Sequence, residues 1–86
     1  MDEALGEPIG KVEHFFSKIG VAIINIENGS IKVSDTIRIK GHTTDFEQKI
    51  ESMQVDHKEV QEAKKGDDIG MKVAEPVRGH DVVYKV

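Results

Sequence analysis

The stretch Val21–Lys40 constrains the fold of this chain more than any other part of the sequence. Val21–Ile26 is a short, mostly β-branched run, which favours a strand and is too short for a stable helix. Thr36–Lys40 alternates strictly between polar and apolar residues, as a half-buried strand does. Turn residues at Asn28-Gly29 and Ser34-Asp35 separate the two runs. The sequence therefore predicts a first strand buried on both faces over much of its length, a turn, and a second strand buried on one face.

Further short strands are expected along the whole chain. The other runs with strand-like patterns lie between turn residues, at 9–16, 46–55, 69–73 and 82–86. About six short strands with turns every 8–12 residues predict an all-β fold, a small six-stranded antiparallel Greek-key β-barrel. Asp56–Lys65 is polar except for Val60 and Ala63, and we interpret it as an irregular connection that tucks these two side chains under the barrel.

The apolar phase shifts between Ile50 and Met53, which are an odd number of residues apart. A β-bulge near Glu51-Ser52 is the predicted way to keep both side chains facing inward. At the N-terminus, Pro8 is expected to open the barrel, so that residues 1–7 form a flexible tail and 8–86 a single domain.

Composition limits the classes of function. The 86 residues include 16 acidic and 12 basic side chains, for a formal net charge of −4, which argues against binding nucleic acid through overall charge and leaves only a local basic face. The chain has no cysteine, which fits a reducing compartment. It also lacks a run of ~20 apolar residues, so we predict a cytoplasmic protein without a membrane partner.

No pattern typical of catalysis or metal binding is present. The four histidines, at positions 14, 42, 57 and 80, are far apart in the sequence and lack zinc-motif spacing. Gly6–Lys11 differs from a phosphate loop in its spacing and has Val12 where a Ser or Thr is needed. We therefore expect no catalytic residues, no metal site, no cofactor and no bound nucleotide, and a chain that is not an enzyme.

Three segments carry a family resemblance. Gly29–Ile37 reads GSIKVSDTI, Ile50–Met53 reads IESM, and Glu62–Gly70 reads EAKKGDDIG. Together, and in this order, they resemble domain 2 of the translation GTPases typified by elongation factor Tu. The resemblance covers about 9–86 and implies a Greek-key barrel that binds its partners, here in a stand-alone elongation factor-like chain without the GTPase domain.

The resemblance also implies where aminoacyl-tRNA would bind. In elongation factor Tu, an acidic pair, a valine and an aromatic residue on the first strand, with a threonine on the second, help to hold the terminal adenosine. The corresponding positions here are the run Gly10-Lys11-Val12-Glu13 and Ile23, so only Val12 matches. Lys11 remains available to contact a phosphate.

The first four strands supply the expected binding residues. One of the adjacent rings Phe15 and Phe16 is expected to face outward, because neighbouring strand residues point in opposite directions. The predicted RNA- or partner-binding residues are Lys11, Glu13, Phe15, Lys18, Arg38 and Lys40. The alternative for the basic residues is a mixed ionic surface that discourages aggregation.

Two functions from different classes follow. The first is a non-catalytic translation-related module that contacts RNA, tRNA or the ribosome. The second is a protein-interaction module that resembles the barrel appended to collagenase-like peptidases, to which Asp45–Ile50 (DFEQKI) is similar. The protein partner would then be a GTPase or a peptidase.

Overall fold

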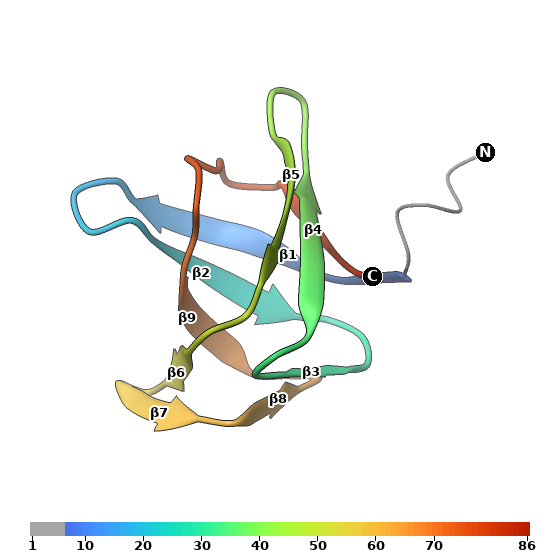
Figure 1. Cartoon of the computed structure of the whole chain (residues 1–86), viewed down its shortest axis with the longest axis vertical. Coiled ribbons are helices and arrows are strands. Elements are labelled where there is room, and N and C mark those ends of the chain that lie inside the picture. Colours follow the sequence, from blue (N-terminus) through green and yellow to red (C-terminus); the bar gives the residue numbers. More distant parts are fainter. Residues whose placement is uncertain (1–6) are drawn as a thin grey trace.

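The computed structural model describes residues 7–86, and Figure 1 shows that this part of the chain consists of strands and turns. No helix in it is long and apolar enough to cross a membrane. The strands are β1 (Glu7–Phe16), β2 (Val21–Ile26), β3 (Ser30–Lys32), β4 (Thr36–Lys40), β5 (Asp45–Lys49), β6 (Met53–Val55), β7 (Lys58–Val60), β8 (Glu62–Lys64), β9 (Asp68–Lys72) and β10 (Val82–Lys85). Of the expected flexible tail, residues 1–6 lie outside the described part, and Glu7 already belongs to β1.

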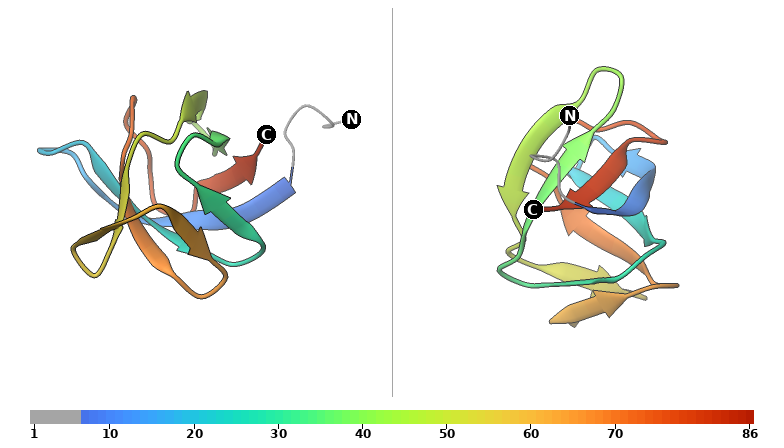
Figure 2. Two further views of the ribbon diagram at one scale, coloured as in Figure 1. Left: turned by 60° about the horizontal axis from the view of Figure 1, so that its bottom comes forward. Right: turned by 90° about the vertical axis from the view of Figure 1, so that its right-hand side faces the viewer.

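Eight of the strands form one antiparallel sheet in the order β5-β4-β10-β1-β2-β9-β6-β7, while β3 pairs with β8 in a separate two-stranded sheet. The larger sheet curls strongly around the core, as the two views in Figure 2 show. The predicted all-β antiparallel barrel is confirmed. The described residues contain ten strands rather than about six, because four of them are only three residues long.

Strand β1 is central to the sheet and pairs with both β2 and β10. Its register shifts between Pro8 and Gly10 against β10, and between Val12 and His14 against β2. Such irregularities increase local twist, which helps a sheet to close. Gly10 is required here, because a Cβ at this position would collide with the carbonyl oxygen of Asn25.

The core fills the inside of the curled sheet with aliphatic side chains. Its buried members are Ile9, Val12, Ala22, Ile24, Ile26, Ile31, Ile37, Ile39, Ile50, Met53, Ala63, Ile69, Met71, Val77 and Val83. The prediction that β2 is buried on both faces is wrong: Ala22, Ile24 and Ile26 face the core, but the alternate residues are only half-buried. No described element covers the outer face of β2. A continuous apolar run is therefore compatible here with a strand that is fully buried on one face only.

The segment 56–65 is more regular than predicted. Instead of an irregular connection it contains β7 and β8, because Asp56 and His57 both adopt positive φ (53° and 66°) and turn β6 back into β7. A two-residue turn of this kind is usually signalled by Asn-Gly or Asp-Gly, which is absent here. Ala63 is buried and Val60 packs against the core, as expected.

The odd spacing of Ile50 and Met53 is solved by a break between strands rather than by a bulge at Glu51-Ser52. Strand β5 pairs with β4 and ends at Lys49, whereas β6 begins at Met53 and pairs with β7 and β9. Both Ile50 and Met53 are buried. The chain thus changes partner strands where a bulge was predicted, and both side chains still face inward.

Gln48 connects the two halves of the curled sheet. Its Nε2 donates to the carbonyl oxygen of Lys72 at 2.9 Å, and the backbone N–H of Ala74 donates to its Oε1 at 2.8 Å. A side-chain amide carries a donor and an acceptor, as a peptide group does. Gln48 of β5 therefore bonds to the end of β9 and the residues after it, where no strand pairs with β5.

Candidate partner-binding surfaces

Two of the predicted binding residues share a row on the outside of the sheet. Lys40 of β4 is opposite Val82 of β10, which is in turn opposite Lys11 of β1. Residues aligned in this way point to the same face, and two strand spacings place these lysines about 10 Å apart. The same row ends in Asp45 on β5 and, beyond β2, in Asp68 on β9. Two lysines between two aspartates give the row no net positive charge.

Arg38 is occupied by carboxylates. Its guanidinium lies 2.8 Å from Asp45 and 3.8 Å from Glu47, and its Nε also donates to Asp45 at 2.9 Å. Both acidic residues are on β5, the strand next to Arg38. A phosphate would have to displace these carboxylates to reach the arginine.

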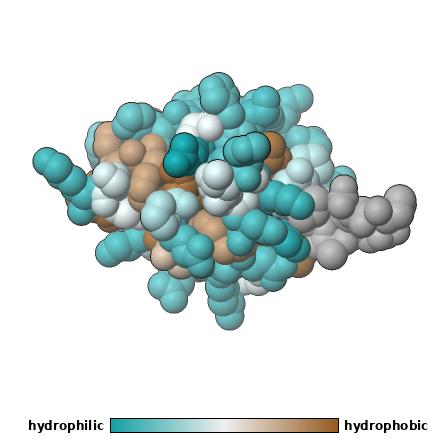
Figure 3. Space-filling view, turned by 90° about the horizontal axis from the view of Figure 1, so that it is seen from above, coloured by the Kyte–Doolittle hydropathy of each residue, from teal (hydrophilic) through white to brown (hydrophobic). Residues whose placement is uncertain are grey.

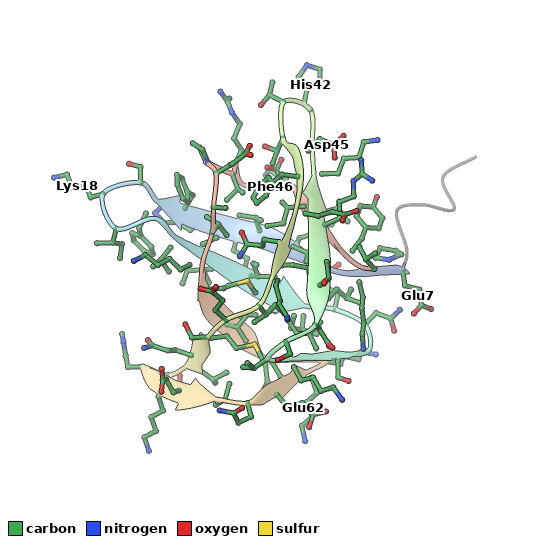
Figure 4. All side chains as sticks on the ribbon, viewed as in Figure 1. Glu7, Lys18, His42, Asp45, Phe46 and Glu62 are labelled. Atoms are coloured by element: carbon green, nitrogen blue, oxygen red, sulfur yellow. The ribbon has the colours of Figure 1, made fainter. Side chains whose placement is uncertain are left out.

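The remaining predicted residues lie elsewhere. Lys18 is exposed in the β1–β2 turn, and Figure 4 shows it at the tip of that hairpin, well away from Asp45. Glu13 is exposed next to the irregularity in β1, while Phe15 is partly buried and packs against the core. The six residues therefore do not converge on one site. The expectation that one of the two adjacent rings faces outward is confirmed, and that ring is Phe16.

The apolar hollow is a surface depression of about 360 Å³ on the outer face of β1, β2 and β9. Its apolar wall consists of Phe16, Ile19, Val21 and Ile23. Phe16 is 44% exposed and Ile19 is 60% exposed, which is unusual for large hydrophobic side chains in this chain. Figure 3 shows a mainly hydrophilic surface whose hydrophobic side chains gather toward the side where the β1–β2 hairpin extends in Figure 1.

Strand register explains why these side chains meet. Phe16 is opposite Val21, and Ile23 lies between His14 on β1 and Gly70 on β9. The His14 ring packs edge-on against Phe16, with ring centroids 4.4 Å apart. Neighbouring strands therefore present one continuous apolar face.

The rim of the apolar hollow is acidic and polar. Asp56 and His57 reach it from the β6–β7 turn, and Asp68 reaches it from β9. Asp68 also accepts a hydrogen bond of 2.6 Å from the Asn25 side chain, which fixes its carboxylate. No lysine or arginine is among the described residues that line the hollow.

The apolar hollow was not expected from the sequence. The sequence does contain a signal for it. Phe16, Ile19, Val21 and Ile23 lie close to one turn, and the strands on either side of that turn carry apolar residues at consecutive positions, so apolar side chains point to both faces. Because the larger sheet curls around one core, only one of these faces can be covered by it.

Metal binding finds no support in the described geometry. Within residues 7–86, no three His, Cys, Asp or Glu side chains are grouped closely enough to hold a metal ion. The four histidines are all exposed.

Comparisons with known proteins give two related results. The family model for elongation factor Tu domain 2 matches residues 20–77. The chain is also 44% identical over 77 residues to an uncharacterized protease of Methanocaldococcus jannaschii, and 38% identical over 78 residues to a collagenase of Porphyromonas gingivalis. These matches cover 88% and 90% of the chain but only 19% and 22% of the relatives, so the chain spans about a fifth of their length.

Solved structures resemble the whole described fold. The C-terminal domain of a U32 peptidase from Geobacillus thermoleovorans superimposes with a TM-score of 0.86 at 22% identity, covering 93% of this chain and 92% of that domain. The structure of the selenomethionine variant of that domain gives the same TM-score, and the superposition covers 92% of this chain and 99% of the variant. At this identity the likeness establishes the fold.

Proposed function

Because the chain belongs to the elongation factor Tu domain 2 family, whose barrels are parts of larger proteins, we propose that it is a non-catalytic protein-binding domain of collagenase-like peptidases. The proposal is supported by the fold that the chain shares with the C-terminal domain of a U32 peptidase. The proposal extends that likeness to a role: the barrel binds another part of a peptidase or a protein that the peptidase engages.

The single observation that carries the proposal is the pattern of coverage. Nearly all of this chain aligns at 38–44% identity with about a fifth of each protease. A segment of this size that recurs with the same barrel fold is a domain, and the larger remainder of the proteases is where a peptidase active site has room.

The cysteine-free sequence fits a reducing compartment, and a cytoplasmic location is part of the proposal.

An exchange of domains tests this function. In full-length Porphyromonas gingivalis collagenase, the matched 78-residue segment is either deleted or replaced by this chain. We expect deletion to lower cleavage of a fluorescent collagen substrate and replacement to restore it. A replacement protein that is folded by circular dichroism but no more active than the deletion variant overturns the proposal, and so does a deletion without effect.

A second candidate function is contact with RNA, tRNA or the ribosome. The observation that favours it is that Lys11 and Lys40 share one face and neither forms a salt bridge within the described residues. Binding to total tRNA that weakens steeply with salt, and that is lost in Lys11→Gln and Lys40→Gln, supports this function. Binding that is absent, or unchanged in both variants, counts against it.

A further inference from the structure

We infer that the apolar hollow is a docking site for a protein segment that combines a large aliphatic side chain with an adjacent lysine or arginine. This inference rests on the proposed protein-binding function and assigns it to one surface. On this inference the row that contains Lys11 and Lys40 faces solvent and binds no partner.

The shape and chemistry of the hollow fit an aliphatic side chain. A volume of about 360 Å³ lies near the lower end of the range of ~300–1,000 Å³ for binding pockets. Phe16 and Ile19 lose water-exposed apolar surface when such a side chain enters, which is favourable in proportion to the area covered. The His14 ring packs edge-on against Phe16 beside the hollow.

Charge complementarity selects a basic partner. Asp56 and Asp68 line the hollow, and its described lining contains no lysine or arginine to neutralise them. Asp68 is already oriented by Asn25. A lysine or arginine next to the docked side chain reaches these carboxylates, whereas an acidic segment or a phosphate is repelled.

Gly70 keeps the floor of the hollow open. A Cβ at this position would lie 3.6 Å from the Ile23 side chain and 3.8 Å from the Val21 side chain, which is ordinary van der Waals contact. Gly70 is in β9 and its φ is not positive, so the backbone accepts another residue. Larger side chains here should therefore fill the hollow without straining the barrel, and they provide a test that leaves the core intact.

The test measures fluorescence anisotropy with the complete 86-residue chain and two probes. One probe is a fluorescein-labelled hexapeptide of alternating leucine and lysine, and the other is the same peptide with glutamate in place of lysine. We expect the lysine peptide to bind at least about tenfold more tightly than the glutamate peptide, a difference of about 1.4 kcal/mol. The advantage should shrink in 0.5 M NaCl, because salt screens the charge term.

Variants locate the site. Gly70→Val and Ile23→Thr should each weaken the lysine peptide about tenfold, and the pair Asp56→Asn with Asp68→Asn about fivefold. Val86→Ser removes an exposed hydrophobic side chain outside the hollow, and Glu62→Gln removes an exposed carboxylate outside it; both should bind as the unaltered chain does. Gly70→Ala replaces Gly70→Val if the latter fails to fold.

The outcomes separate this inference from the proposed function. Equal binding of the two peptides, or unchanged binding in folded Gly70 and Ile23 variants, overturns the hollow as the docking site. If the exchanged domain nevertheless restores collagenase cleavage, the protein-binding function stands and acts through another surface. If the peptide binds in the hollow but the exchanged domain restores nothing, the docking site stands and the link to peptidases fails.

Discussion

The outer face of β5, β4 and β10 differs from that of β1, β2 and β9, although both cover the same core. On the first, Arg38 is paired with Asp45 and Glu47, and Lys40 is opposite Asp45. On the second, Phe16 and Ile19 are exposed around a hollow with an acidic rim. A charged side chain on a strand is therefore a poor guide to a binding site when its neighbour strand already supplies the counter-charge. An exposed aliphatic wall has no such partner within the described residues.

The largest expected effect distinguishes the core from the apolar hollow on a single strand. Ile24→Ala removes a fully buried side chain and should lower the free energy of unfolding by about 2–5 kcal/mol. Ile23→Ala, on the outer face of the same strand, should cost less than about 1 kcal/mol. Urea denaturation of both variants measures the difference. Equal losses would mean that the outer face of β2 is buried, and the hollow would not exist in solution.

Gln48→Ala tests how the two faces are held together. The variant loses two hydrogen bonds to the chain at and after the end of β9, which should lower the free energy of unfolding by about 1–3 kcal/mol. Amide hydrogen exchange should accelerate at Ala74, whose N–H loses its acceptor. Gln61→Ala, an exposed glutamine elsewhere, is the control and should change stability by under about 0.5 kcal/mol. Matching losses in the two variants would remove Gln48 from this role.

Gly70→Ala should raise stability. The new methyl group has room beside Ile23 and Val21, and alanine restricts the unfolded chain more than glycine does. We expect a gain of about 0.4–1 kcal/mol, seen as a higher midpoint in thermal unfolding. A loss of stability would show that the backbone at Gly70 needs glycine, so the open floor would be a structural requirement of β9.

The smallest effect concerns the charged face. Arg38→Gln removes ion pairs at the surface and should lower the free energy of unfolding by about 0.2–1 kcal/mol in low salt, with the difference vanishing near 1 M NaCl. Arg78→Gln, at an exposed arginine outside these ion pairs, serves as the control. A loss of stability that does not depend on salt would indicate that Arg38 stabilises the barrel through packing of its side chain rather than through its ion pairs.

Local sequence patterns predicted most of the fold. Alternation in Thr36–Lys40 and the odd spacing of Ile50 and Met53 are local properties, so the strand was found where expected and both Ile50 and Met53 are buried. The β6–β7 turn was missed because Asp56-His57 adopts positive φ without glycine. The break at 51–52 was predicted as a bulge, since sequence alone does not show which strand becomes the next partner.

The binding surface was harder to predict than the fold. Arg38 and Lys40 are conspicuous in the sequence, but their acidic neighbours come from β5 and are visible only once strands are paired. Conversely, the apolar hollow combines the β1–β2 hairpin with Gly70 and the β6–β7 turn, which are far apart in the chain. Strand register brings these parts together, and a search for motifs does not reveal it.

A backbone-amide NMR titration of the labelled 86-residue chain tests the central claim, that partners bind at the apolar hollow and not at the lysine row. The ligands are the leucine–lysine hexapeptide and, separately, total tRNA at near-physiological salt. The account predicts peptide-induced shifts at Phe16, Ile19, Ile23 and Gly70, with Lys11 and Lys40 unmoved. Shifts at Lys11 and Lys40 with tRNA, and none in the hollow with peptide, would contradict it and favour the RNA-binding function.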